Sequence, residues 1–195
     1  MKDQFKDYHI ILASGSPRRQ QFLKDLELDF EIQLKPVEEI YPDHLKAEEI
    51  TDFLAELKAE AFKNNLNEKD ILITSDTIVW HKGVALGKPK SKTEAITMIK
   101  SFVNDWHQVI SSVSFTTKTQ QITKSFTTKV HFTNLKDKEI EHYVNTYEPM
   151  DKAGSYGIQE WIGLIGIDRI EGSYFNVVGL PTHIVYKTLI ELTNS

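Results

Sequence analysis

The spacing of apolar positions predicts that strands and helices alternate from the start of the chain. Residues 10–13 form a short run rich in β-branched side chains, and the turn-forming residues 14–17 follow, which indicates a buried strand entering a tight turn. Ser16 suits a helix cap and Pro17 suits a first helical position. Apolar residues then recur at helical spacing to about residue 27. The opening unit is therefore predicted to be strand, turn and helix.

The next segments predict a long helix and a broken strand. After a short extended segment near residues 30–34, residues 47–64 place their apolar side chains on one helical stripe. Residues 71–80 have the composition of a strand, which we expect to be interrupted at Ser75-Asp76.

A third helix and a hairpin are predicted in the middle of the chain. Ser91 and Glu94 have the spacing of a capping box, and apolar residues at helical spacing follow them. Residues 108–132 are rich in Val, Ile, Thr and Phe around a polar break at 118–121, which indicates an antiparallel hairpin.

The last third of the chain predicts a short helix around residues 140–144 and a glycine-rich polar loop at 149–159. Strands are expected near 164–170 and 175–178, and a final helix after Pro181. Because the hairpin breaks a strictly parallel pattern, we predict a mixed α/β fold, in which helices flank a central sheet. Residues 1–195 are expected to form a single domain with two lobes and a cleft.

Composition narrows the class of protein. Hydrophobic residues at 40% and charged residues at 26% are ordinary for a soluble globular protein. No apolar run approaches the roughly 18 residues of a membrane span, and the first residues are charged, so we expect a cytoplasmic protein without membrane contact. The absence of cysteine excludes disulfides, thiolate zinc sites and cysteine nucleophiles. The net charge of −5 argues against general nucleic-acid binding.

A candidate anion site lies at the first turn. Arg18 and Arg19 are two of only three arginines and stand at the predicted helix start, where exposed N–H groups and the helix dipole favour an anion. Guanidinium groups match phosphate oxygens, and Ser14 and Ser16 add hydroxyl donors. The alternative interpretation is a capped helix with two solvated arginines.

Two acidic segments are candidates for metal binding or proton transfer. Asp76 follows an apolar strand, where α/β folds place catalytic groups, and beside Thr77 it could bind a hard cation or accept a proton from water. Glu39, in the pair Glu38-Glu39, offers a second carboxylate. A structural aspartate in a turn and a solvated acidic pair are the alternatives.

Other candidates are weak on sequence alone. Lys88 follows a Gly-rich segment that lacks one spacer residue of a phosphate loop and has Pro89 where that loop needs Ser or Thr. Lys58 lies on the predicted long helix, where most lysines are solvated. The seven histidines have no zinc-binding spacing, and the three tryptophans are better explained as core or edge aromatics than as base-stacking platforms.

Several of these segments, taken together and in order, resemble the Maf family of nucleotide pyrophosphatases. The resemblance covers nearly the whole chain. The matching segments are 12–19, Lys58-Ala59, Ser75-Asp76-Thr77, Gly87-Lys88-Pro89, 148–154 and 171–181. It implies a Maf/ITPase-like α/β fold in a protein that is usually a homodimer. It also implies an enzyme that hydrolyses a nucleoside triphosphate to the monophosphate and pyrophosphate with a divalent cation.

The loop 156–159 resembles the subgroup that acts on dTTP and UTP, in which the positions of Arg18, Thr77 and Gln159 are associated with substrate choice. Glu160 and Trp161 depart from the glycine that the subgroup commonly has after this glutamine, and Ser75 replaces a frequent alanine. A pyrimidine is therefore expected, through the O4/N3–H edge that the Gln159 amide can read.

Our hypothesis gives these residues roles in a single mechanism. Asp76 and Glu39 would hold Mg²⁺ or Mn²⁺, and Asp76 would orient or deprotonate the attacking water. The cations Arg18, Arg19, Lys58 and Lys88 and the serines of the first turn would bind the phosphates. We expect the acidic and basic groups to share one pocket. A nucleotide-binding regulatory module, or a pyrophosphatase for purine or modified nucleotides, are the alternatives.

Overall fold

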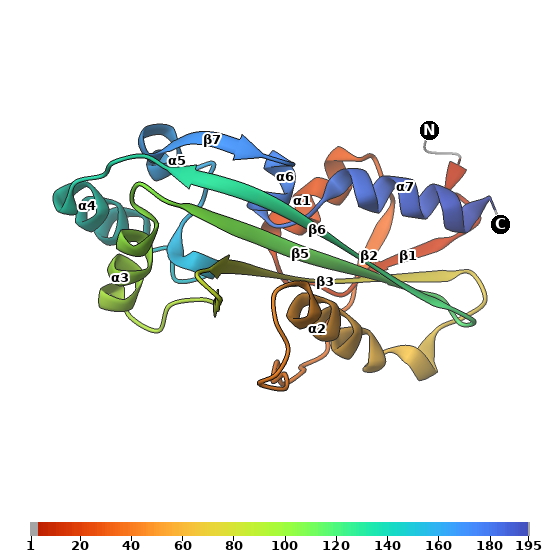
Figure 1. Cartoon of the computed structure of the whole chain (residues 1–195). Coiled ribbons are helices and arrows are strands. Elements are labelled where there is room, and N and C mark those ends of the chain that lie inside the picture. The colour runs from red at the N-terminus through yellow and green to blue at the C-terminus, as the bar shows by residue number, and fades with distance from the viewer. Residues whose placement is uncertain (1–3, 195) are drawn as a thin grey trace. The chain divides into compact units, whose positions relative to one another are not determined.

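The computed structural model describes residues 4–194 as a mixed seven-stranded sheet with helices packed on it (Figure 1). The strand order is β2-β1-β3-β5-β6-β7, and β4 pairs with β3 outside this path. The strands are β1 (His9–Leu12), β2 (Phe30–Ile32), β3 (Asp70–His81), β4 (Val84–Leu86), β5 (Trp106–Thr116), β6 (Gln121–Phe132) and β7 (Ile167–Glu171).

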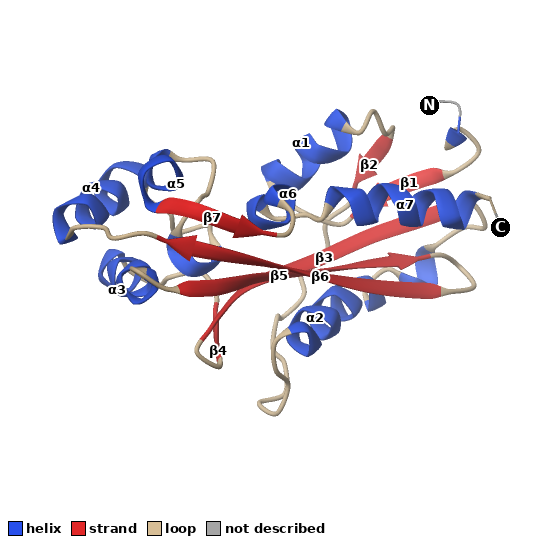
Figure 2. Ribbon diagram, turned by 45° about the horizontal axis from the view of Figure 1, so that its top comes forward, coloured by secondary structure: helices blue, strands red, loops and turns tan. Residues whose placement is uncertain are grey.

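The helices lie between these strands along the chain (Figure 2). They are α1 (Pro17–Asp25), α2 (Glu48–Glu60), α3 (Lys92–Phe102), α4 (Asp137–Tyr147), α5 (Trp161–Gly166), α6 (Tyr174–Val178) and α7 (Thr182–Thr193), with short 3₁₀ turns at Lys63–Asn65 and Ala153–Ser155. Strand β1 is parallel to β2 and β3, whereas β4 and β7 pair antiparallel with their neighbours. The mixed α/β prediction is confirmed.

Contacts divide the chain into two compact units. The first comprises the residues up to 76, residues 111–126 and the residues from 179 onward; the second comprises residues 77–110 and 127–178. Strands β3, β5 and β6 contribute residues to both units. Two lobes were predicted, and two units are present.

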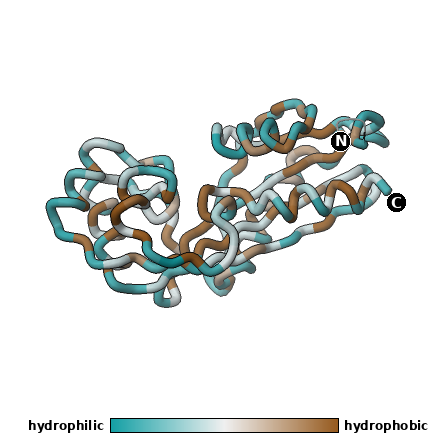
Figure 3. Tube along the Cα trace, turned by 90° about the horizontal axis from the view of Figure 1, so that it is seen from above, coloured by the Kyte–Doolittle hydropathy of each residue, from teal (hydrophilic) through white to brown (hydrophobic). Residues whose placement is uncertain are grey.

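The first unit has apolar side chains on both faces of its strands. Ile10 and Ile71 pack with Leu189 of α7 in one cluster. Because side chains alternate across a strand, Ile11 and Leu72 point to the other face, where they pack with Phe62. Figure 3 shows apolar positions recurring along α7, the helix that leads to the C-terminus, as expected for a helix with one buried face.

The second unit has its own core. Residues of α3, α4, α5, β3, β5 and β6 contribute to it, and its members Phe102, Phe132 and Tyr143 are fully buried. The ring of His107 stacks on Phe102 with centroids 4.3 Å apart. Each unit therefore buries an apolar cluster of its own.

Three predictions about elements were wrong. Strand β3 runs unbroken through Ser75-Asp76, because the backbone stays extended while its neighbour changes from β1 to β4. Residues 161–166 and Tyr174–Val178 are short helices, and only Ile167–Glu171 is a strand. The long helix ends at Glu60, before the 3₁₀ turn.

Within residues 4–194, no helix combines the length and the apolar character that crossing a bilayer requires.

Candidate active site

The middle of β3 carries the acidic centre of the site. Strand β1 pairs with residues 70–73 and β4 with residues 79–81, so Asp76 lies on the stretch of β3 between these two pairings. The hydroxyl of Thr74 donates to the carbonyl of Ala55 in α2 at 2.7 Å. Because side chains two apart on a strand share a face, Asp76 also points toward α2.

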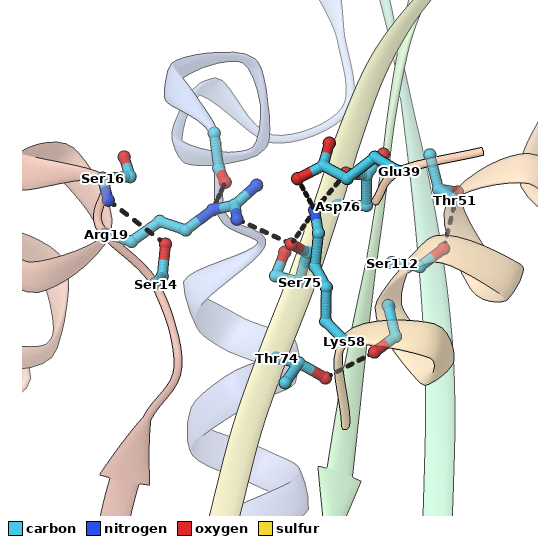
Figure 4. A network of polar contacts seen from close by, with 12 residues as sticks. Ser14, Ser16, Arg19, Glu39, Thr51, Lys58, Thr74, Ser75, Asp76 and Ser112 are labelled. Atoms are coloured by element: carbon cyan, nitrogen blue, oxygen red, sulfur yellow. Dashed lines mark hydrogen bonds and ion pairs between the residues drawn. The ribbon is translucent and has the colours of Figure 1, made fainter. Parts of the chain in front are cut away.

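Lys58 meets Asp76 from that helix. It lies three residues after Ala55, on the same helix face. Its Nζ is 2.6 Å from Oδ1 of Asp76 and 3.1 Å from Oε1 of Glu39. The side chains of Lys58 and Asp76 are 16% and 10% exposed and that of Glu39 is 54% exposed, so one ammonium group connects a buried and an accessible carboxylate (Figure 4).

Arg19 reaches the same segment from α1. Its Nη1 donates to the carbonyl of Ser75 at 2.7 Å and its Nε donates to the carbonyl of Gly179 at 2.9 Å. Burial lowers the pKa of the Arg19 guanidinium, while the negative charge of Asp76 opposes this effect. In Figure 4, Arg19 and Lys58 approach the Ser75–Asp76 segment from opposite sides. Arg19 therefore fixes the backbone that carries the aspartate.

The first turn is held by local hydrogen bonds at the start of α1. Ser16 occupies the N-cap position of α1 with extended backbone, and Pro17 begins the helix, as predicted. The backbone N–H of Ser16 donates to Oγ of Ser14 at 3.3 Å, and Gln20 holds the Ser14 carbonyl at 3.1 Å. The expected capping hydrogen bond from the Ser16 side chain is not formed within the described chain. Arg18 is half-buried, and its charge contributes to the lowered pKa of Arg19.

Three of the predicted site residues belong to the second unit: Thr77, Lys88 and Gln159. Lys88 is exposed just after β4. The N–H of Gly154 donates to the carbonyl of Gly87 at 3.0 Å, so the loop that carries Gln159 is bonded to the segment that carries Lys88. Their approach to Asp76 stays a prediction.

Two residues of the site were missed from the sequence as functional groups: Ser75 and Gly179, which act through backbone carbonyls. The Ser75 carbonyl accepts from Arg19 and, at 3.5 Å, from Lys58. Its hydroxyl is buried and finds no hydrogen-bond partner among the described residues. This agrees with the resemblance, in which the family often has alanine at this position, because alanine has no hydroxyl to place. The one sequence signal for Gly179 was its place in the last motif of the family resemblance.

The donor set fits a hard divalent cation. Asp76 and Glu39 supply carboxylate oxygens around one position of positive charge, now held by the Lys58 ammonium. Within residues 4–194 no three His, Cys, Asp or Glu side chains form a complete metal site. Magnesium typically takes one or two protein carboxylates and completes its shell with water and substrate phosphates, so two carboxylates suffice.

The geometry therefore combines a carboxylate held in place and cations beside it with the N-terminus of α1, an end of a helix that favours negative charge. Such a set can bind a phosphate chain and orient a water molecule against it.

Comparisons with known proteins identify one family over nearly the whole chain. The family model for Maf-like proteins matches residues 9–192. A dTTP/UTP pyrophosphatase of Christiangramia forsetii is 58% identical over the whole of both chains. Relatives with the same name from Flavobacterium johnsoniae and Bacteroides fragilis are 59% and 48% identical, covering 98% and 95% of this chain and 99% and 96% of their own.

A solved structure shows the same fold. The Ham1 protein of Staphylococcus aureus aligns over 92% of this chain and 99% of its own, with a TM-score of 0.50 and 17% sequence identity. From the match of the family model and the identity to these relatives, the chain belongs to the Maf family.

Proposed function

We propose that the protein is a metal-dependent pyrophosphatase that hydrolyses dTTP and UTP to the monophosphate and pyrophosphate. The observation that carries this proposal is the Lys58 ammonium between the carboxylates of Asp76 and Glu39, beside the Ser75 carbonyl that Arg19 holds. The names of relatives up to 59% identical over nearly full length support the same substrates.

In the proposed reaction, water attacks the α-phosphorus and the bond from this phosphorus to the bridging oxygen breaks. Asp76 orients the water and takes its proton. Arg19 keeps Asp76 in place through the neighbouring carbonyl, so the carboxylate needs little reorganisation. Pyrophosphate leaves with the bridging oxygen.

The cations of the chain bind the substrate and its developing charge. Arg18, Ser14 and Ser16, in and just before the first turn of α1, would bind phosphate oxygens, and Lys58 and Lys88 would add positive charge. Asp76 and Glu39 would hold the Mg²⁺ or Mn²⁺ that the family's activity implies. When bound, this ion supplies charge neutralisation of the phosphate oxygens.

Base choice is assigned to the second unit and to Arg18. Gln159 is exposed at the end of its loop, and its amide offers one donor and one acceptor to the O4/N3–H edge of uracil or thymine. Thr77 and Arg18 are the other residues that we propose for substrate selection. A single domain over residues 1–195, a homodimer and a cytoplasmic location remain parts of this proposal.

Substitution of the two carboxylates tests the proposal. Asp76→Asn should keep the fold but lower pyrophosphate release from dTTP about 100-fold or more, as loss of a general base does. Glu39→Gln should raise the Mg²⁺ concentration needed for half-maximal rate. Glu38→Gln, which changes the exposed neighbour of Glu39, is the matched control and should leave both unchanged. Full activity of Asp76→Asn would remove Asp76 from catalysis.

A further inference from the structure

The loop before α5 is held unusually firmly for a glycine-rich segment. Residues 154–158 are all buried, and Gln159 is the first exposed residue after them. The hydroxyl of Tyr156 lies 2.6 Å from Nε2 of His107, and the N–H of Glu160 donates to the carbonyl of Gly157 at 3.0 Å. The loop is therefore fixed on both sides of Gln159.

Glu160 is the centre of this arrangement. The hydroxyl of Tyr143 in α4 donates to Oε2 of Glu160, and Nζ of Lys152 lies 3.0 Å from Oε1. The same Tyr143 oxygen accepts the N–H of Gly157 at 3.0 Å. The Lys152 and Glu160 side chains are 11% and 20% exposed, so water competes little with these contacts.

Two glycines make room for the loop. A Cβ on Gly157 would come within 2.8 Å of the Glu160 carboxyl carbon, so the carboxylate lies directly over this glycine. A Cβ on Gly163 would come within 1.9 Å of the Ile158 carbonyl oxygen, so the first turn of α5 packs against the backbone just before Gln159. Both contacts restrict where residues 157–160 can run.

We propose that Glu160, held by Tyr143 and Lys152, is a positioning residue that determines base selection by fixing the backbone of Gln159. The inference rests on the proposed function. Glu160 is covalently next to Gln159 and itself bonded on both carboxylate oxygens, so movement of its side chain moves the residue that reads the base. A hydrogen-bonding side chain displaced by even 1 Å discriminates poorly.

A double-mutant cycle tests this role. kcat and KM would be measured for UTP and CTP, whose bases differ at the edge that Gln159 is proposed to read. Glu160→Ala should lower the UTP-to-CTP ratio of kcat/KM about 10-fold, mainly through a higher KM for UTP, because uniform binding rather than chemistry is lost. Glu160→Gln, which can still accept from Tyr143, should restore the ratio to within about 3-fold of wild type. Gln159→Ala and the double variant should have equal ratios, since Glu160 acts through Gln159.

Glu171→Gln is the matched control, because it removes an exposed carboxylate paired with Lys129 at 3.6 Å in the same unit. It should keep the wild-type ratio. An unchanged ratio in Glu160→Ala, multiplied effects in the double variant, or equal loss of kcat for both nucleotides would overturn the inference while leaving the proposed function intact. A wild-type protein that releases no pyrophosphate from UTP would overturn the proposed function and this inference with it.

Discussion

Asp76 illustrates how one residue depends on a charged partner. Only 7% of the residue is exposed, and a carboxylate removed from water is costly unless a cation or hydrogen bonds compensate for the lost solvation. Lys58 supplies this compensation at 2.6 Å and is also close to Glu39. The Lys58–Asp76 ion pair therefore stabilises the folded protein even when no substrate is bound.

Removal of the Lys58 ammonium should reveal this double role. Lys58→Ala leaves Asp76 without its cation, so we expect the free energy of unfolding at pH 7 to fall by about 1–3 kcal/mol, the usual cost of a charged group left unsatisfied. Lys63→Ala is the control, because Lys63 pairs with Glu60 at 2.8 Å with both side chains more than half exposed. It should cost less than about 0.5 kcal/mol. Urea denaturation of the two variants measures these losses. Equal losses of unfolding free energy would contradict a stabilising role for the Lys58–Asp76 pair.

At this scale the sequence predicted side chains better than backbone groups. Asp76 and Lys58 meet because strand alternation and helix spacing direct these two side chains toward each other from β3 and α2. The family resemblance, not the spacing, singled out Lys58 beforehand, and Glu39, which Lys58 also contacts, lies in a segment without a regular pattern. The carbonyls of Ser75 and Gly179 could not be identified in the same way, since every residue has a carbonyl and only the folded path of the chain selects these two.

Elements with a clear period were predicted, and short apolar runs were not. Helices α3 and α7 and the β5–β6 hairpin appear where the sequence pattern placed them, and α2 begins where predicted but ends earlier. The run 161–166 has no polar break that would distinguish a strand from one turn of helix, which is the known ambiguity of short apolar segments. The sequence around Gly163 also did not indicate that the Ile158 carbonyl packs against this glycine.

Substitution of Gly163 in α5 by alanine has two opposite expected effects on stability. By helix propensity alone, Gly163→Ala in α5 would stabilise the protein by about 1 kcal/mol. The Ile158 carbonyl oxygen, 1.9 Å from the added Cβ, instead predicts a loss of about 2–4 kcal/mol, since backbone must move. The change in the midpoint of urea denaturation decides between them, and a stabilised variant would show that the loop is looser than described.

For the whole molecule, the two units have separate apolar clusters although the family model spans both. The sequence predicted two lobes, but it could not place the boundary. The chain crosses between units inside β3, β5 and β6, where strand composition continues without a linker or glycine-rich break. Because these three strands contain no Gly- or Pro-rich break, the sequence pattern does not indicate where one unit ends.

The stability of the whole protein should depend on pH through the core of the second unit. Burial, with a smaller contribution from nearby His81, lowers the pKa of His107 to about 3, and Asp105 opposes the shift. The unfolded chain binds a proton near its ordinary pKa of about 6.5, whereas the folded protein does not. Stability from neutral His107 is therefore fully present above pH 6.5 and is lost as the pH falls toward 3.

Between pH 7 and pH 5 this group alone should lower the free energy of unfolding by about 2 kcal/mol. His107→Gln supplies the comparison, because its neutral amide can still bond to Tyr156 but cannot titrate. Urea denaturation at both pH values should show a loss that is about 2 kcal/mol smaller in the variant than in the wild type. Identical pH dependence in both proteins would mean that folded His107 accepts a proton as readily as the unfolded chain does, and that its ring is reached by water.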